Sequence, residues 1–326
     1  MNFRLLKRVI RVCMLLVGLM VLSLPAAVAE TSEDRPVLVV ASIQPLALLA
    51  RELLQQVEPP ADGNLARIET LLPATVSPHH YALRISDRQR LERADLVVWI
   101  GPELERFLTK TLSSYGDRQL ALAELPQMHW PPSHVSPESK PGEHHHGLDP
   151  HLWLNPDNGV RIVEALVKRL QQLQPGMAES YQRGGERLIA RLRRLDQALA
   201  QLLQPVKDRG FAVYHQGYDH WVTHFGLNQM ASVTLLPEQK PGARHLYQLR
   251  EQLKGQGYCL FVEVNGGNGA VEALARDARL SVKELDPLGV GKTVHSYTGL
   301  LQRIAEGMLQ CLSGQSSLSV NWGEEP

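Results

Sequence analysis

Short runs of branched apolar residues alternate with amphipathic segments along most of this chain, and this alternation constrains the fold more than any other feature. The expected strands are 37–42, 68–72, 95–100, 211–214, 229–235, 258–263 and 280–285. The expected helices are 45–56, 86–93, 103–112, 215–225, 244–253, 269–278 and 296–311. Strands that are separated by helices form parallel sheets with helices on both faces, so the sequence predicts an α/β fold.

A long helical region divides this alternation into two halves. Residues 157–173 and 177–203 are expected to form amphipathic helices. The second has leucines at spacings of three and four residues, at Leu188, Leu192, Leu195, Leu199 and Leu202. At 1.5 Å per residue it would extend about 40 Å, enough to cross from one lobe to another. The pair Gly184-Gly185 is expected to weaken or kink it.

The predicted organisation is therefore two α/β lobes, each with a parallel-sheet sandwich, joined by the long helix. The expected segments are an N-terminal lobe 30–175, a linking helix 176–204, a C-terminal lobe 205–312 and a flexible tail 313–326. Within the first lobe, residues 127–150 are rich in Pro, Ser, Gly and His and poor in large aliphatic residues. This composition predicts a mobile loop.

The first 29 residues have the composition of a signal peptide. Basic residues in 4–11 precede an apolar stretch, 12–24, and Ala27-Val28-Ala29 is a small-residue cleavage site. We expect export to the periplasm with cleavage after Ala29. The alternative is an uncleaved membrane anchor, because the apolar stretch is close to spanning length. No later segment is apolar enough to span a bilayer.

Charge and cysteine content describe the expected mature chain. Removal of residues 1–29 takes away four basic residues and no acidic residue before Glu30, which leaves 30 basic against 34 acidic residues, a net charge of −4. This balance gives no reason to expect a nucleic-acid partner. Cys259 and Cys311 are the cysteines that remain, and an even pair in an exported protein predicts a disulfide. The alternative is two buried free thiols.

Three histidines stand in distinctive positions of this pattern. His79 follows an expected strand by a short loop, His215 directly follows another, and His151 opens the stretch HLWLNP. Two carboxylates, Glu263 and Asp286, also end or follow expected strands. Open α/β sheets bind ligands beyond the carboxyl ends of their strands. Imidazole is a good zinc ligand and zinc takes four ligands, so a zinc site is the natural hypothesis.

The other histidines carry a weaker signal. A single histidine is more often a surface or hydrogen-bonded structural residue than a metal ligand, and this is the expectation for His80, His220, His224, His245 and His295. His129 and His134 belong to the expected mobile loop, as does the run Glu143-His144-His145-His146.

Four stretches together resemble a known family. They are SPHHYALRISD (77–87), ADLVVWIGPELE (94–105), HLWLNP (151–156) and LDPLG (285–289). The chain is similar over nearly its whole mature length to the metal-binding solute-binding proteins of ABC importers, and most of all to the periplasmic high-affinity zinc-uptake (ZnuA-like) members. The resemblance implies a metal site between two α/β lobes that a rigid backbone helix joins.

The resemblance also implies the ligands. The first three fall on His79, His151 and His215, and the fourth falls on Asp286, with water or Glu263 as alternatives. Members that take manganese or iron tend to have a carboxylate at the third position, so His215 favours zinc. Some zinc members have a glutamate where Pro78 stands here, and that ligand is missing.

Further expectations follow from the same resemblance. Cys259 and Cys311 fall where zinc-uptake members carry a disulfide. The run His144, His145 and His146 falls in a loop that is rich in histidine and acidic residues in those members, which implies an auxiliary site that collects or senses zinc. The alternative for this run is a solvated polar loop, because a loop must lose conformational entropy to bind an ion.

The function that the resemblance implies is capture of periplasmic Zn²⁺, as a transported ligand, and its delivery to an ABC-type permease with a cytoplasmic ATPase. We expect a monomer and no enzymatic activity. The alternatives are a manganese- or iron-binding importer component, a metal-dependent adhesin and a zinc hydrolase. The last is disfavoured because the sequence has no His-Glu-x-x-His helix or similar hydrolase signature.

Overall fold

The computed structural model describes residues 35–61, 63–132, 149–255, 257–264, 269–291, 294–314 and 322. The chain divides into two units, Met1–Arg35 and Pro36–Pro326. The helices and strands of both lobes belong to the second unit. The expected signal peptide, His134 and the run Glu143-His144-His145-His146 lie outside the described residues. No helix within the described ranges is long and apolar enough to cross a membrane.

The first lobe contains a parallel sheet of strand order β2-β1-β3-β4. Its strands are β1 (Leu38–Ala41), β2 (Arg67–Thr70), β3 (Leu96–Trp99) and β4 (Gln119–Ala121). Its helices are α2 (Gln44–Gln55), α3 (Ile85–Arg93) and α4 (Thr109–Leu112). The central strands β1 and β3 are buried at every position, as their uninterrupted apolar sequences require.

Two expectations for this lobe were wrong in detail. The segment 103–112 is not one helix but a 3-10 turn, Arg106–Leu108, followed by the single-turn helix α4. The strand β4 was not expected, because only three residues form it and their sequence, Gln-Leu-Ala, has too little apolar character to signal a strand.

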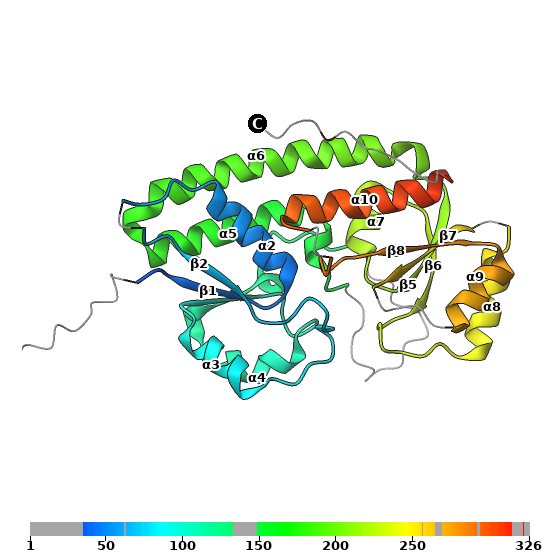
Figure 1. Cartoon of the computed structure of the whole chain (residues 1–326), viewed down its shortest axis with the longest axis horizontal. Helices are drawn as coiled ribbons and strands as arrows, with labels where there is room; N and C mark the ends of the chain where they lie inside the picture. Colours follow the sequence, from blue (N-terminus) through cyan, green and yellow to red (C-terminus); the bar gives the residue numbers. More distant parts are fainter. Residues whose placement is uncertain are drawn as a thin grey trace, which may run out of the picture. The chain divides into compact units, whose positions relative to one another are not determined.

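The second lobe repeats the architecture with the strand order β6-β5-β7-β8, again all parallel. Its strands are β5 (Gly210–His215), β6 (Gln229–Thr234), β7 (Gly257–Glu263) and β8 (Ser281–Leu285). Its helices are α7 (Asp219–Phe225), α8 (Ala243–Leu253), α9 (Gly269–Ala278) and α10 (Tyr297–Ser313). Figure 1 shows the two sheets in separate lobes, which confirms the predicted fold class.

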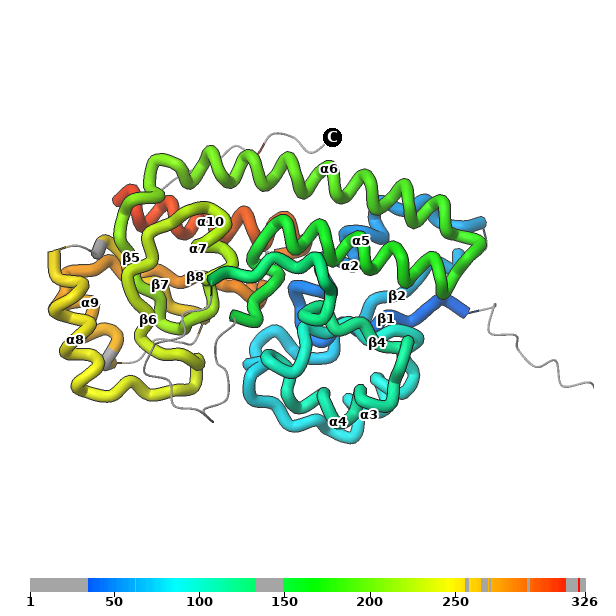
Figure 2. Tube along the Cα trace, turned by 180° about the vertical axis from the view of Figure 1, so that it is seen from behind, coloured from blue at the N-terminus to red at the C-terminus, as the bar shows by residue number. Residues whose placement is uncertain are grey.

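Helices α5 (Pro156–Leu173) and α6 (Ala178–Leu203) lie between the two halves of the sequence. The 26 residues of α6 run past both lobes, as Figure 2 shows from behind. Gly184 and Gly185 do not break the helix, since α6 is helical through both residues. A Cβ atom at Gly184 would lie 2.6 Å from Val57 Cγ2, and one at Gly185 would lie 2.6 Å from Val167 Cγ2. The two glycines therefore let α6 pack closely on its neighbours.

Helix α10 belongs to both halves of the structure. It packs on β7 and β8 of the second lobe and also on α2 and α6. At its beginning, Thr298 donates hydrogen bonds from its backbone N (3.1 Å) and Oγ1 (2.7 Å) to the buried carboxylate of Glu52 in α2. Near its end, Cys311 forms a disulfide with Cys259 of β7, which confirms the predicted pairing.

The two ends of the expected mobile loop are packed against the protein. Met128 is buried, and His129 exchanges backbone hydrogen bonds with the Asn158 side chain of α5, at 2.8 and 3.0 Å. Asp149 is also buried. The expectation of a mobile loop is therefore wrong at these ends, and its middle, 133–148, lies outside the described residues.

Candidate metal site

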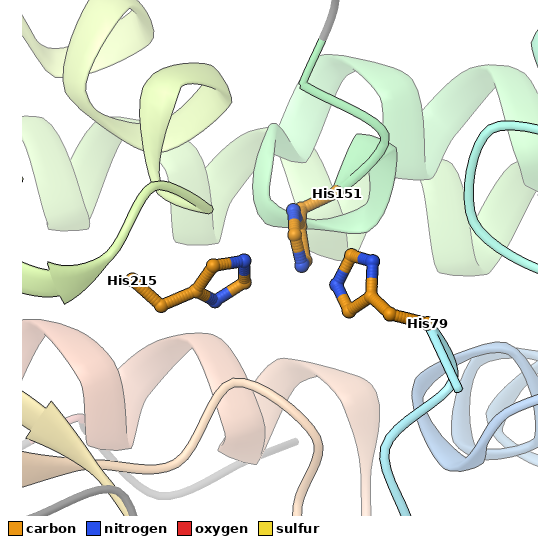
Figure 3. A group of neighbouring side chains, drawn as sticks. All are labelled: His79, His151 and His215. Atoms are coloured by element: carbon orange, nitrogen blue, oxygen red, sulfur yellow. The ribbon is translucent and has the colours of Figure 1, made fainter. Parts of the chain in front are cut away.

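Three histidine side chains converge in the cleft between the lobes (Figure 3). One ligand nitrogen from each of His79, His151 and His215 lies within 4.8 Å of those of the other two. The ring centroid of His79 is 5.3 Å from those of both His151 and His215, which are 5.0 Å from each other. The structure thus brings together the three histidines that the sequence singled out.

His215 is held by the parallel pairing of β5 and β7. It is the last residue of β5 and not, as expected, the first residue of a helix, because α7 begins only at Asp219. Glu263 ends the neighbouring strand β7, and its Oε1 lies 2.9 Å from His215 Nδ1. A carboxylate on Nδ1 leaves the other nitrogen for a metal. That Nε2 atom is buried and has no hydrogen-bond partner.

His151 is oriented by Asp149, two residues before it. Asp149 Oδ1 lies 2.5 Å from His151 Nδ1 and accepts a 3.0 Å hydrogen bond from the His151 backbone N. Asp149 Oδ2 accepts a 2.8 Å hydrogen bond from the backbone N of Asp219, which opens α7. Burial disfavours the charged carboxylate, but the facing His151 and these hydrogen bonds outweigh burial and hold the pKa of Asp149 below its ordinary value.

His79 comes from the loop between β2 and α3. Burial, and then the neighbouring His151 and His215, lower its pKa to about 2, so the ring is neutral at physiological pH. Its Nε2 is buried without a hydrogen-bond partner. Among the described residues, no carboxylate is bonded to the His79 ring, in contrast to the other two histidines. A neutral imidazole with a free lone pair is the form that binds a metal ion.

The histidines line a cavity of about 220 Å³ together with Asp286, Glu263 and Glu238. Asp286 does not belong to the three-histidine group, although it follows β8 as expected. Its Oδ2 accepts a 2.9 Å hydrogen bond from the Gly291 backbone N, and its Oδ1 is buried without a partner. The described lining has three carboxylates and no Lys or Arg, so the cavity favours a cation.

Trp153 links the loops that carry His151 and Asp286. Its indole Nε1 donates a 2.8 Å hydrogen bond to the backbone O of Pro287, which directly follows Asp286. Its own backbone O accepts a 2.5 Å hydrogen bond from the hydroxyl of Tyr297 at the start of α10. Both aromatic side chains are fully buried. These contacts fix the Asp286 loop relative to His151.

Two residues of this site were missed in the sequence. Asp149 could have been found, because ligand histidines commonly donate their second nitrogen to a nearby carboxylate and Asp149 stands two residues away. Gly217 carried no usable signal, since only the fold shows its role. A Cβ atom there would lie 2.8 Å from His215 Cε1 and 2.9 Å from His151 Cε1.

Other histidines stay out of this cluster in the described part of the chain. His220 is buried and lies 2.8 Å from the Asp149 backbone O through Nε2, so it is structural, as expected. His224 lies 2.6 Å from Asp196 of α6. His80 is outside the cluster although it adjoins His79, and its side chain is 61% exposed.

The chain also matches a family of known proteins. The family model described as zinc-uptake complex component A, periplasmic (ZnuA), matches residues 39–311. The chain belongs to this family. This membership confirms the resemblance that the four sequence stretches indicated.

Individual relatives agree with this assignment. The chain is 35% identical to the high-affinity zinc uptake system protein ZnuA of Yersinia pestis over 84% of this chain and 91% of that protein. It is 30% identical to the protein of the same name from Haemophilus ducreyi, over 84% of this chain and 93% of the relative. A crystal structure of a zinc-bound ZnuA deletion mutant is 25% identical, covers 85% of this chain and 98% of its own, and has a TM-score of 0.68.

Proposed function

We propose that this protein binds Zn²⁺ in the periplasm at His79, His151 and His215 and delivers it to the membrane permease of an ABC importer with a cytoplasmic ATPase. The convergence of three imidazoles in a cleft between two lobes carries this proposal. Two of the three have buried Nε2 atoms without partners, which is the arrangement that a bound ion would complete. The names of the zinc-uptake relatives support the same cargo.

The donor set favours zinc over manganese or iron. Imidazole nitrogen suits zinc, whereas manganese prefers carboxylate, carbonyl and water oxygen. We propose Asp286 as the fourth ligand, because its Oδ1 is buried without a hydrogen-bond partner. Glu263 is the weaker candidate, since its Oε1 lies against His215 Nδ1. A water molecule in the cavity is the remaining alternative.

The proposed role is transport and not catalysis. A catalytic zinc needs an open position and a general base beside it. Glu263, a candidate base in the cavity, is engaged in orienting His215. We further propose a monomer, cleavage after Ala29, lobes 30–175 and 205–312 joined by the linking helix 176–204, and an auxiliary zinc site at His144, His145 and His146.

Metal analysis of the protein, purified without a polyhistidine tag, tests the proposed cargo. We expect one tightly bound zinc per chain, and a stoichiometric content of manganese or iron would overturn the assignment. Zinc-dependent binding of the loaded protein to its permease in lipid nanodiscs tests delivery. Turnover of substrates in a colorimetric hydrolase panel would instead support the enzyme alternative.

A further inference from the structure

Outside the three-histidine group, a histidine and a glutamate face each other at the solvent-exposed edge of the cleft, which is called its mouth below. His80 lies in the first lobe, on the loop between β2 and α3, and Glu238 lies in the second lobe, between β6 and α8. His80 Nε2 is 3.7 Å from Glu238 Oε2. The side chains are 61% and 38% exposed, so both reach solvent. The pair therefore spans the two lobes at a place where an ion from solvent can arrive.

The spacing of this pair fits a shared metal ion. Zinc binds imidazole nitrogen and carboxylate oxygen at about 2.0–2.2 Å, which places two such ligands of a tetrahedral site about 3.4 Å apart. The observed separation exceeds this by only a few tenths of an ångström, and two exposed side chains can close that difference by small rotations. Water would fill the other positions.

One member of the pair also belongs to the acidic lining of the cavity. Glu238 lines the same cavity as Glu263 and Asp286, and the described lining has no Lys or Arg. His80 is the chain neighbour of His79, whose ring belongs to the three-histidine group. A cation that reaches Glu238 is thus attracted further inward, toward the histidines.

We propose that His80 and Glu238 form a weak capture site that holds a divalent zinc ion at the mouth before it moves to His79, His151 and His215. This proposal rests on the proposed function and adds a site that the ion occupies before it reaches the three histidines. With two protein ligands and water, the site binds zinc much more weakly than three imidazoles do, so the ion leaves it readily. Because one ligand comes from each lobe, an ion there also draws the two loops together.

The test measures the binding of a second zinc ion to protein that already holds one equivalent of zinc. All forms carry serine at positions 144, 145 and 146, so that these histidines do not contribute. We compare this background with His80→Ala and Glu238→Gln, and with the exposed control changes His245→Ala and Glu272→Gln. Calorimetry gives the affinity for the second ion. Stopped-flow mixing of zinc-free protein with zinc gives the rate at which the first ion is bound.

We expect the second zinc to bind about tenfold more weakly in each of the two variants than in the background and the controls. Loading of the first zinc should slow by about threefold at low ionic strength, because a negative charge or a ligand is lost at the mouth. The affinity for the first zinc should fall by no more than the loading rate does, because neither residue is one of the proposed ligands of that ion. Glu238→Gln is the more informative variant. Residue 238 is far from His79 in the sequence, so this change does not alter the backbone next to that ligand.

The measurements distinguish a failure of the proposed function from a failure of the capture site. If the background protein binds no zinc tightly, the proposed function itself is wrong. If the first zinc binds tightly but the second ion and the loading rate are the same in the background and in both variants, the three-histidine site stands and the capture site is wrong.

Discussion

Replacing Asp149 with asparagine would test how the site holds its central histidine. The carboxylate accepts at Oδ1 from His151 and at Oδ2 from the backbone N of Asp219, and it is buried. A carboxylate accepts hydrogen bonds at both oxygens, whereas an amide has one acceptor and one NH₂ donor. Asparagine at position 149 must therefore turn its NH₂ group either toward His151 or toward the N–H of Asp219. Turned toward His151, the NH₂ group removes both contacts of Oδ1, and turned toward Asp219, it removes the contact of Oδ2.

The size of the effect follows from these contacts. A hydrogen bond to a charged group contributes about 1.5–3 kcal/mol. In the first orientation the His151 ring is no longer fixed with its proton on Nδ1 and its Nε2 free for the ion. In the second, a neutral amide oxygen replaces the charged acceptor and holds that proton less strongly. Loss of such a partner weakens metal binding by about 10- to 100-fold. The tenfold end of this range is equivalent to about 1.4 kcal/mol.

Competition with a chromophoric zinc chelator at neutral pH measures the affinity. Asp277→Asn, an exposed aspartate in α9, is the matched control and should bind zinc as the unchanged protein does. Thermal unfolding without zinc shows whether the Asp149→Asn protein is folded. A folded Asp149→Asn protein that binds zinc as tightly as the control would refute the idea that Asp149 orients His151.

Three further predictions concern the ligands, the polar loop and a buried glutamate. His215→Ala should lower zinc affinity by at least about tenfold, since it removes one of three imidazoles, and an unchanged value in competition titration would remove His215 from the site. Deletion of 142–146 should leave one tightly bound zinc per chain by metal analysis, and loss of that ion would make this segment part of the primary site. Burial raises the pKa of Glu105 from 4.5 to about 7, so its protonated form stabilises the fold fully below pH 4.5 and this contribution is lost as the pH rises through 7. Relative to Glu105→Gln, the unchanged protein should lose up to about 3 kcal/mol of unfolding free energy across that range, and urea denaturation curves that shift in parallel with pH would contradict this.

Much of the fold could be predicted because its central strands β1, β3 and β5 are buried on both faces. Short, continuous apolar runs such as those of β1 and β3 are typical of strands in the middle of a parallel sheet. The helices between such strands favour parallel pairing. The strand β4 escaped prediction because pairing with β3, and not its own sequence, makes it a strand. The packing role of the glycines in α6 could not be predicted for a related reason, since it depends on Val57 and Val167, which are distant in the chain.

That the three histidines lie together could be predicted from the family resemblance, while the strand ends account only for His79 and His215, each in its own lobe. Their orientation could not. The contacts that turn His151 and His215 toward the cavity come from Asp149 and Glu263, and the His215 contact requires the pairing of β5 with β7. The carboxylate contacts that orient the histidines therefore become visible only in the tertiary structure.

The return of α10 to α2 has a mechanical consequence. Two separate helices, α6 and α10, connect the two lobes. Helix α10 is held at its beginning by the Glu52–Thr298 hydrogen bond and near its end by the disulfide to β7. Two such connections restrict both the bending and the twisting of one lobe relative to the other. We therefore expect the lobes to part little when cargo is exchanged, so that the short segments around His79 and Glu238 have to supply the displacement that lets an ion pass.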